Sequence, residues 1–284
     1  MLNGNTIATA NGEKYLCEIR GALKKKYKIL IGDYVEICKD NASDKYIITK
    51  IYDRLNSLLR PPLANLEQLF IVIAKKPEPD LTLVDKLIIY CFKNNISPIL
   101  VLNKKDLFSQ DEIDDLKKQY ISVVDDFVVV SAKNNETECL KEFLGGKLSA
   151  FVGQSAVGKS TIINNVFPDL NLRTNGLSKK IDRGKHTTRH SEIFIDNEIK
   201  IVDTPGFSML DLLDVEPSEL SDYYPDFSEY VDSCIYNNCT HINTTSKECG
   251  VVDAVFNNQL SKDRYERYCL LYKNLLEKWR KRYD

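Results

Sequence analysis

The sequence predicts an α/β fold, with a doubly wound sheet in the middle of the chain, a small β-barrel before it and a helical segment after it. Three observations predict this arrangement. Short alternating strands fill residues 1 to about 60, apolar strands alternate with helices from 69 to 202, and a Cys/His cluster precedes a long helical pattern at the end. We therefore expect three domains, at 1–65, 66–213 and 214–284.

The composition is that of a globular protein without a membrane span. Hydrophobic residues make up 43% and charged residues 28% of the 284 residues. No apolar run reaches the roughly 18 residues that a span needs, and residues 1–5 lack the basic and apolar regions of a secretory signal. We expect cytoplasmic residence and no membrane partner. In that compartment the eight cysteines favour metal binding or burial over disulfides.

Residues 1 to about 60 show the pattern of a small all-β domain. Short alternating or β-branched stretches occur at 15–20, 33–37 and 45–49, and glycine or asparagine residues between them mark turns. About five such strands in so short a segment indicate a small barrel. An OB-fold fits this pattern and an SH3-like barrel fits it nearly as well. OB-folds often bind nucleic acid on one face.

Charge is unevenly distributed along the chain. Residues 1–65 carry 11 basic and 7 acidic side chains, residues 216–260 carry 1 and 8, and residues 261–284 carry 8 and 4. Two basic ends are compatible with binding a polyanion. Ordinary surface charge explains them equally well.

From residue 69 strands and helices alternate, as in a doubly wound sheet. The continuous apolar run 69–74 is typical of a buried parallel strand. Further strands are expected at 98–102, 127–130, 148–152, 191–196 and 199–202, and helices at 81–94 and 110–119. Polar motifs come directly after these strands, at the sheet edge where such folds bind ligands.

A phosphate-binding loop follows the strand at 148–152. Its residues are Gly153, Gln154, Ser155, Ala156, Val157, Gly158, Lys159 and Ser160, with Thr161 next. The two glycines let the backbone turn its N–H groups toward phosphates, and the following helix adds the positive end of its dipole. We expect Lys159 to reach the terminal phosphates and the Ser160 hydroxyl to bind Mg²⁺.

Two more motifs follow strand ends and point to the base that is bound. One is Asn103, Lys104, Lys105 and Asp106, and the other is Ser131, Ala132 and Lys133. The Asp106 carboxylate can accept hydrogen bonds from guanine N1–H and from its exocyclic amine, which adenine cannot supply. Since an unpaired buried acceptor costs free energy, the motifs predict GTP rather than ATP.

The order of these motifs is unusual. The base-reading motifs precede the phosphate loop, and the motif from Asp203 to Gly206 follows it, whereas an ordinary GTPase opens with the phosphate loop. A domain can be cut at a surface loop and its old ends joined, because termini usually lie close together. The sequence therefore predicts a circularly permuted P-loop GTPase domain. In it, Asp203 would reach Mg²⁺ and the Gly206 N–H would sense the γ-phosphate.

The group that positions the attacking water needs a separate candidate. Phe207 stands where many GTPases carry a glutamine for that task. His186, in the segment 184–190, is the nearest candidate, and contact with a partner is the alternative role. One of Thr187 and Thr188 is expected to complete the Mg²⁺ shell and to sense the γ-phosphate.

A cluster of metal-ligand residue types lies near the C-terminus. Cys234, Cys239, His241 and Cys249 would provide three thiolates and an imidazole, a closed tetrahedral shell for one zinc ion. Since no ligand is left over, we expect a structural zinc that holds together the loop-rich segment 232–250.

The terminal pattern, from about 251 to 283, predicts a helix that mixes basic and aromatic residues. The basic residues are Arg264, Arg267, Lys273, Arg280, Lys281 and Arg282. They could neutralise RNA phosphates. The spacing of Tyr265, Tyr268, Tyr272 and Leu276 instead favours packing of the tyrosines on the domain core, with the basic residues still facing RNA.

Taken together, these features resemble the ribosome-small-subunit-dependent GTPase A family (RsgA, also called YjeQ or YloQ) over essentially the whole chain. The resemblance rests on the permuted order, Arg54 and Arg60-Pro61, the 184–189 loop, the 203–207 motif, the Cys/His cluster, and Ser261, Arg264, Tyr265 and Tyr268. Two departures are visible. Gln154 and Ala156 stand where the family usually has Pro and Gly, and the spacing from His241 to Cys249 is longer than usual.

The resemblance implies an N-terminal OB-fold, a permuted GTPase domain and a C-terminal helical zinc-binding domain. It implies that GTP or GDP, the small ribosomal subunit and its rRNA are partners, that the subunit stimulates a slow GTPase during late maturation, and that another assembly factor is released. We expect a monomer.

The permutation suggests a mechanism. The γ-phosphate-sensing loop leads into the C-terminal domain, and the barrel precedes the other new end near Leu66. We hypothesise that GTP fixes the two accessory domains in a grip on rRNA and that hydrolysis releases it. The competing interpretation is a nucleotide-dependent RNA-binding switch with incidental hydrolysis that acts on another RNA.

Overall fold

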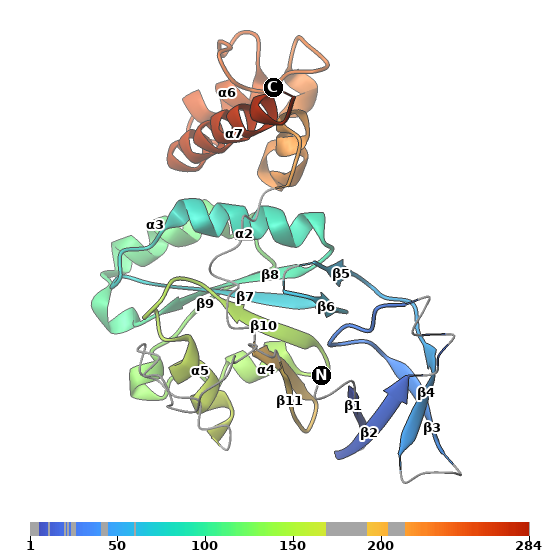
Figure 1. Cartoon of the computed structure of the whole chain (residues 1–284). Coiled ribbons are helices and arrows are strands. Elements are labelled where there is room, and N and C mark those ends of the chain that lie inside the picture. Colours follow the sequence, from blue (N-terminus) through green and yellow to red (C-terminus); the bar gives the residue numbers. More distant parts are fainter. Residues whose placement is uncertain are drawn as a thin grey trace.

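The computed structural model describes residues 6–10, 12–19, 21, 23, 27–40, 45–59, 61–168, 192–203 and 214–283 (Figure 1). It consists of a small N-terminal sheet, a central sheet covered by helices, and a C-terminal helical region. The strands are β1 (Thr6–Ala10), β2 (Glu13–Ile19), β3 (Val35–Lys39), β4 (Tyr46–Ile51), β5 (Ser57–Leu58), β6 (Leu63–Ala64), β7 (Gln68–Ala74), β8 (Ser97–Asn103), β9 (Asp126–Val129), β10 (Leu148–Val152), β11 (Glu192–Asp196) and β12 (Ile199–Asp203). The α-helices are α2 (Leu81–Lys93), α3 (Gln110–Tyr120), α4 (Leu140–Leu144), α5 (Lys159–Val166), α6 (Gly250–Phe256) and α7 (Lys262–Tyr283).

The N-terminal region is a curled sheet with the order β1-β2-β4-β3. β2 pairs with β4 in parallel, and the other two pairs are antiparallel. Cys17, Ile29 and Ile48 are buried at the centre of its small core. The strands predicted at 15–20, 33–37 and 45–49 are confirmed as β2, β3 and β4. The choice between an OB-fold and an SH3-like barrel stays a prediction.

The central sheet has the order β11-β12-β10-β7-β8-β9, and only β11 runs antiparallel to its neighbour. β10, which precedes the phosphate loop, lies in the middle. The strands that come earlier in the chain flank it on one side, and those that come later flank it on the other. The sheet order therefore reverses between β10 and β7, which is where a doubly wound sheet opens a crevice for a ligand.

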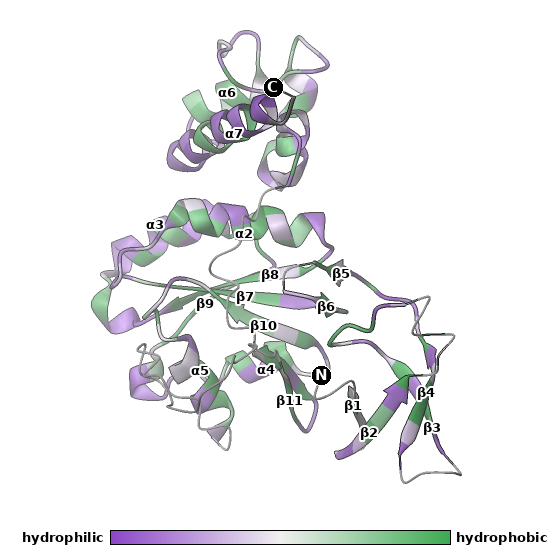
Figure 2. Cartoon of the chain, viewed as in Figure 1, coloured by the Kyte–Doolittle hydropathy of each residue, from purple (hydrophilic) through white to green (hydrophobic). Residues whose placement is uncertain are grey.

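Helices cover both faces of this sheet (Figure 1). Alternate residues of β7 serve the two faces, because successive side chains of a strand point in opposite directions. Leu69, Ile71 and Ile73 join α2 and α3 in one apolar core, while Phe70, Val72 and Ala74 join α4 and α5 in the other. Figure 2 shows the central strands as predominantly hydrophobic, as expected of strands buried on both faces.

The C-terminal region begins with three short 3₁₀ helices, Pro217–Tyr223, Pro225–Phe227 and Val231–Ser233. The prediction of one helix from 251 to 283 is wrong, because the chain turns between α6 and α7. Asn258 has a φ of +58°, a conformation that asparagine tolerates at a helix end. The Gln259 N–H then bonds the Ala254 carbonyl, which ends α6.

α2 lies between the central sheet and the C-terminal region (Figure 1). Val84, Leu87 and Ile88 belong to the core of the sheet, whereas Ile89 belongs to the core of the C-terminal region, with Leu220 and others. Among the described residues, no helix is both long and apolar enough to cross a membrane.

Candidate functional site

The phosphate loop joins the end of β10 to the start of α5, as the sequence predicts. Gly153 has a φ of +138° and Gly158 a φ of +103°, backbone conformations that L-residues rarely adopt. A Cβ at Gly153 would lie 2.1 Å from the Val72 carbonyl oxygen, and a Cβ at Gly158 would lie 2.3 Å from Asn103 Nδ2. Both glycines are therefore required by the backbone angle and by a close neighbour.

Lys159 turns back onto the loop that precedes it. Its Nζ donates to the carbonyl oxygens of Gly153 at 2.8 Å and Gln154 at 2.7 Å. Partial burial lowers the pKa of Lys159 from its ordinary value, because desolvation disfavours the ammonium form. A phosphate group in the loop would compete with these two carbonyl oxygens for the Lys159 ammonium. Its negative charge would favour the charged form of the lysine.

Asn103 connects three of the predicted motifs. Its Nδ2 donates to the Val157 carbonyl of the phosphate loop at 2.8 Å, and its Oδ1 accepts the Ala132 N–H at 3.0 Å. The side chain is only 1% exposed. One buried amide therefore fixes the phosphate loop relative to the loop after β9, which is how motifs far apart in sequence come together.

The rest of the base-reading motif surrounds Asn103. Asp106 lies on the surface, and its Oδ1 accepts a bond from Ser131 Oγ at 2.8 Å. Lys104 donates to the Ala156 carbonyl at 2.8 Å and also to the Lys76 carbonyl. Lys105 forms an ion pair with Glu136 on the surface, and Lys133 is exposed. The structure thus brings the predicted guanine motifs to one edge of the sheet.

The remaining predicted residues of this site are placed less completely. Ser160 and Thr161 occupy the first turn of α5, directly after Lys159. Asp203 ends β12, which pairs in parallel with β10 and so points to the same edge. His186, Thr187, Thr188 and Gly206 lie outside the described residues.

Sequence reasoning missed the contacts made by two polar residues, Gln154 in the loop and Asn165 of α5. Gln154 joins the loop to the approach to α2, since its Oε1 accepts the Asp80 N–H at 2.9 Å and its Nε2 donates to the Glu78 carbonyl at 3.1 Å. Asn165 of α5 donates to the Ala132 carbonyl at 2.7 Å. Gln154 falls at a variable position of the motif and Asn165 beyond it, so the motif gave no signal for either contact.

The Cys/His cluster is assembled as the sequence predicts. The ligand atoms of Cys234, Cys239, His241 and Cys249 all lie within 4.8 Å of one another. The two thiols of Cys234 and Cys249 are 3.7 Å apart, and His241 Nδ1 lies 3.6 Å and 3.3 Å from them. A tetrahedral ion with Zn–S bonds of about 2.3 Å needs sulfur atoms about 3.8 Å apart. The cluster could therefore hold a zinc ion.

Tyrosines of α7 hold the loop that carries the cluster. Tyr265 donates to the His241 carbonyl at 2.7 Å, and Tyr268 donates to the Thr240 carbonyl at 2.8 Å. Tyr268 is 1% exposed, and Tyr265 and Tyr272 pack partly buried against the same core. The prediction that these tyrosines pack on the domain core is confirmed.

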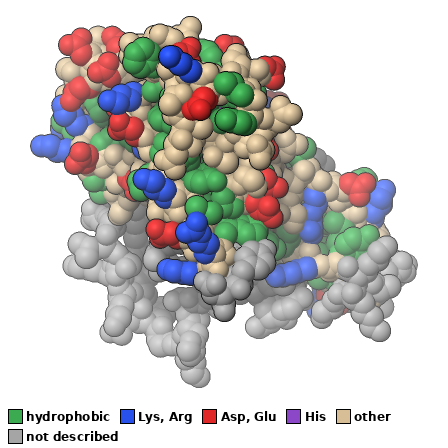
Figure 3. Space-filling view, turned by 90° about the horizontal axis from the view of Figure 1, so that it is seen from above, with side chains coloured by type: hydrophobic (Ala, Val, Ile, Leu, Met, Phe, Trp, Pro, Cys, Tyr) green, Lys and Arg blue, Asp and Glu red, His purple; other side chains and the backbone are tan. Residues whose placement is uncertain are grey.

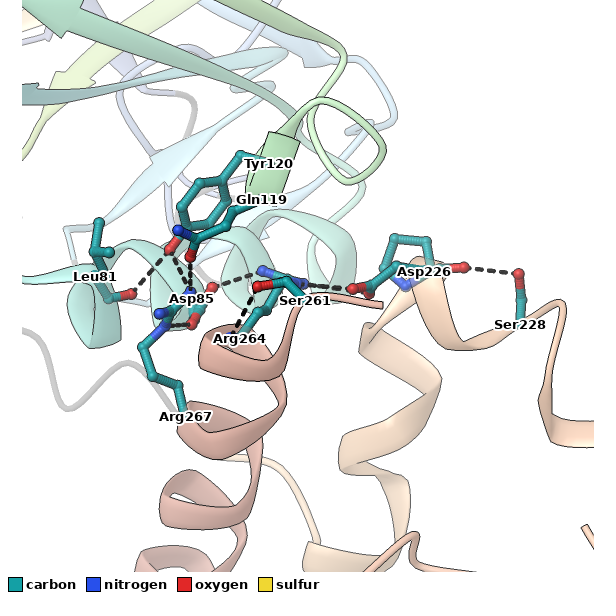
Figure 4. Close-up of polar contacts among 10 residues, drawn as sticks. Leu81, Asp85, Gln119, Tyr120, Asp226, Ser228, Ser261, Arg264 and Arg267 are labelled. Carbon is teal, nitrogen blue, oxygen red and sulfur yellow. Dashed lines mark hydrogen bonds and ion pairs between the residues drawn. The ribbon is translucent and has the colours of Figure 1, made fainter. Parts of the chain in front are cut away.

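The prediction that the basic residues of the terminal helix face RNA is wrong for two of them. Arg264 is 1% exposed and pairs with Asp85 of α2 at 2.6 Å and with Asp226 at 2.9 Å. Arg267 pairs with the other oxygen of Asp85 at 2.5 Å and donates to Gln119 and Tyr120 of α3 (Figure 4). The helical spacing of the tyrosines could not predict that Asp85 and Asp226, which are distant in sequence, form ion pairs with these guanidinium groups.

The surface seen from the side of the C-terminal region does not show one continuous basic face. Lys and Arg side chains are interspersed there with acidic and hydrophobic ones (Figure 3). Lys273, Arg280 and Lys281 of α7 are exposed. Only these members of the predicted basic set are therefore available to a polyanion among the residues whose side chains are described.

The phosphate loop at a central strand, with base-reading loops contributed by strands that come earlier in the chain, defines a circularly permuted P-loop GTPase. A sequence model of the RsgA GTPases matches residues 51–213. A relative from Thermotoga neapolitana, named small ribosomal subunit biogenesis GTPase RsgA, is 36% identical over 271 residues, 93% of this chain and 90% of the relative. A relative of the same name from Alkaliphilus metalliredigens is 40% identical over 265 residues, 91% of this chain and 89% of the relative.

Solved structures agree with the sequence comparison. The crystal structure of YjeQ from Thermotoga maritima matches with a TM-score of 0.81 at 33% identity, covering 96% of this chain and 94% of YjeQ. YloQ, described as a circularly permuted GTPase, matches with a TM-score of 0.79 at 28% identity, covering 98% of this chain and 93% of YloQ. The chain belongs to the RsgA GTPase family, and it is a GTP-hydrolysing enzyme.

Proposed function

We propose that the sheet edge formed by the ends of β8, β9, β10 and β12 binds GTP with Mg²⁺. The nucleotide-binding residues would be Asn103, Lys104, Lys105, Asp106, Ser131, Ala132, Lys133, Gly153, Gln154, Ser155, Ala156, Val157, Gly158, Lys159, Ser160, Thr161, Thr187, Thr188, Asp203 and Gly206. The observation that supports this set best is the position of Asn103, whose buried amide joins the phosphate loop to Ala132.

The proposed roles follow from the geometry of the loop. Loop N–H groups and the start of α5 would hold the phosphates, and Lys159 would move from the two loop carbonyls to the terminal phosphates. The Ser160 hydroxyl and Asp203 would hold Mg²⁺, which neutralises charge on the phosphates when it is bound. Asp106, kept in place by Ser131, would accept the guanine donors.

For hydrolysis we assign the water-positioning role to His186, because Phe207 cannot orient a water molecule. Substitution His186→Ala should lower kcat while leaving GTP affinity within a few fold. A variant that lowers affinity and kcat equally would exclude this role.

For the Cys/His cluster we propose one structural zinc ion. All four side chains point their ligand atoms at one another, and no further Cys, His, Asp or Glu joins the cluster among the described residues. Burial raises the pKa of Cys239 to about 11 and lowers that of His241. Binding of the ion would displace thiol protons and contribute directly to folding of the surrounding loops.

At the level of the cell we propose a cytoplasmic, monomeric factor in biogenesis of the small ribosomal subunit. The names of relatives that align over nine-tenths of the chain support this assignment. Partners would be GTP or GDP, the subunit with its rRNA, and another assembly factor. GTP would fix the accessory domains for binding, and hydrolysis would release them.

Steady-state GTP hydrolysis tests the proposal, measured alone, with small subunits and with large subunits, in parallel with a Lys159→Ala variant. We expect strong stimulation by small subunits only, loss of turnover in the variant, and competition by GDP but not by ATP. Tight GTP binding without stimulation by small subunits would favour the alternative, a nucleotide-dependent switch that acts on another RNA. Equal subunit affinity with GDP and with a non-hydrolysable GTP analogue would contradict the grip mechanism.

A further inference from the structure

Helix α2 packs against both the central sheet and the C-terminal region. One side, with Val84, Leu87 and Ile88, packs in the core of the central sheet. Asp85, Ile89 and Lys93 follow one another at intervals of four residues, which places them on a second side. Ile89 is buried in the C-terminal core, and Lys93 donates to the Asp214 carbonyl. The helix is thus held by the sheet and by the C-terminal region.

An ionic contact on the second side is centred on a fully buried carboxylate. The Asp85 side chain has no exposed surface, and its two oxygens bind Arg264 and Arg267 separately. Arg264 continues to Asp226 of the C-terminal region (Figure 4). Burial raises the pKa of the Asp85 carboxyl, while the two guanidinium groups act in the opposite direction. A buried pair of this kind is sensitive to small displacements, because either partner left alone is a desolvated charge.

The N-terminal end of α2 is bonded to the phosphate loop. Asp80 caps the helix by accepting the Leu83 N–H at 2.9 Å, and its own N–H donates to Gln154 Oε1 at 2.9 Å. Gln154 Nε2 donates to the Glu78 carbonyl at 3.1 Å, so the side chain holds both sides of the turn before the helix. At a rise of ~1.5 Å per residue, Asp80 and Asp85 are only about 7.5 Å apart along the helix axis.

A nucleotide would act on the backbone of the same residue. The Gln154 carbonyl accepts the Lys159 ammonium at 2.7 Å, and phosphates bound in the loop would compete for that ammonium. Loss of this bond frees the Gln154 backbone, while its side chain still holds the start of α2. Nucleotide binding would therefore break a hydrogen bond at Gln154, the same residue whose side chain contacts the start of α2.

We propose that Gln154 is a positioning residue that couples the phosphate loop to the C-terminal region through α2. The coupling rests on the proposed binding of GTP at the loop. It is distinct from the covalent route through residues 204–213, because it passes through side chains at Gln154 and Asp85. Coupling of this kind is reciprocal. If nucleotide binding changes the free energy of the contact between α7 and Asp85, then weakening that contact changes nucleotide affinity by the same free energy.

Hydrogen exchange of the full-length, zinc-loaded protein tests the proposal. Exchange in peptides of α2 and α7 is compared without nucleotide, with GDP and with a non-hydrolysable GTP analogue. We expect nucleotide to change exchange in α7, and Gln154→Ala to remove at least half of that change. The matched control is Gln110→Ala, because Gln110 is exposed on α3 and bonds only Asp114 of the same helix.

A thermodynamic cycle provides a readout that a merely structural role would not change. Arg267→Gln, which removes one of the two contacts to Asp85, should shift analogue affinity by about fivefold, and by less than twofold in the Gln154→Ala background. Asp85→Asn gives a second cycle with the same expectation. In turnover, Gln154→Ala should change KM more than kcat, since the residue positions the loop and touches no reacting atom.

The outcomes separate this inference from the proposed function. If the wild-type protein binds no GTP, the proposed site fails and the coupling falls with it. If GTP binds but α7 does not respond, or responds equally in Gln154→Ala, the nucleotide site stands and the coupling is wrong. Additive effects of Gln154→Ala and Arg267→Gln on affinity would also contradict it.

Discussion

The proposed nucleotide edge, formed by the ends of β8, β9, β10 and β12, and the C-terminal region, residues 214–283, are held in place by different interactions. At the nucleotide edge, parallel strands end together, and backbone angles at Gly153 and Gly158 shape the loop. In the C-terminal region, residues 214–249 form only short 3₁₀ helices and turns. Side chains hold that region, through its apolar core, the Cys/His cluster and the buried pairs of Arg264.

This difference indicates which substitutions should destabilise each region. A segment whose backbone hydrogen bonds are mostly short-range turns depends more on its side-chain contacts, and the loss of one should release much of it. A loop built on strand ends should keep its place when a surface side chain is lost, and should fail where the backbone itself cannot adopt the required angle. The following predictions test this contrast, beginning with the largest effect.

Substitution Cys249→Ser should disrupt the C-terminal region. Binding of a structural zinc contributes on the order of 10 kcal/mol to folding of small metal-dependent segments, and Cys249 is a buried member of the cluster. We expect loss of bound zinc and loss of protection from proteolysis in residues 214–283. Cys139→Ser is the control, because Cys139 is exposed and outside the cluster. Retention of one zinc equivalent in Cys249→Ser would contradict the assignment.

Substitution Arg264→Met should destabilise the joint between α7 and α2. It leaves Asp85 and Asp226 without a shared guanidinium, and removal of one partner of a buried pair costs about 3–5 kcal/mol. The midpoint of urea unfolding followed by tyrosine and tryptophan fluorescence measures the effect. Arg280→Met, on the exposed part of the same helix, should change the midpoint little. Equal effects of the two variants would show that the buried pairs do not hold the region.

Substitution Gly153→Ala should damage the nucleotide edge without affecting the zinc cluster. The added Cβ would meet the Val72 carbonyl and the residue would be strained at a φ of +138°. Strained conformations alone cost about 1–3 kcal/mol, so GTP affinity should fall at least about fivefold. Gly146→Ala is the control, since Gly146 has a φ of +76° but nothing within 4 Å of the added Cβ. Unchanged affinity in Gly153→Ala would place the phosphates elsewhere.

Substitution Asp106→Asn should alter base preference more than stability. Asp106 is exposed, and among the described residues its side chain bonds Ser131, so the fold should tolerate the change. Asparagine keeps one acceptor oxygen and replaces the other with an NH2 donor, so one guanine donor loses its partner, which costs about 1–3 kcal/mol. We expect the GTP affinity to fall about tenfold or more and ATP affinity to stay the same, as measured by competition with a fluorescent guanine nucleotide. A fall in both affinities would indicate that Asp106 shapes the loop instead.

The sequence predicted the phosphate loop and the strands that end beside it because their signals are local. The glycines of the loop, the apolar strand at 69–74 and the polar residues after each strand lie within a few positions of one another. Parallel pairing then places the strand ends together without further information. The Cys/His cluster was also predictable, because its four residues fall within 16 positions of the chain.

The contacts between regions could not be read in the same way. Asp85 and Arg264 are separated by 179 positions, and no periodicity relates them. One available signal is that Asp85 is the only carboxylate in α2 and that its neighbours at 84 and 87–89 are apolar, since a carboxylate so placed needs a buried partner. The break between α6 and α7 was missed because helix periodicity continues on both sides of the turn at Asn258.

The most direct test of the contrast is region-resolved hydrogen exchange before and after zinc removal with a chelator, in protein saturated with GDP. We predict that exchange rises throughout 214–249 and in α6, while the amides of β7, β8 and β10 remain protected and GDP stays bound. If the central strands lose protection together with the C-terminal region, or if zinc removal leaves residues 214–249 unchanged, the account of two separately ordered regions is contradicted.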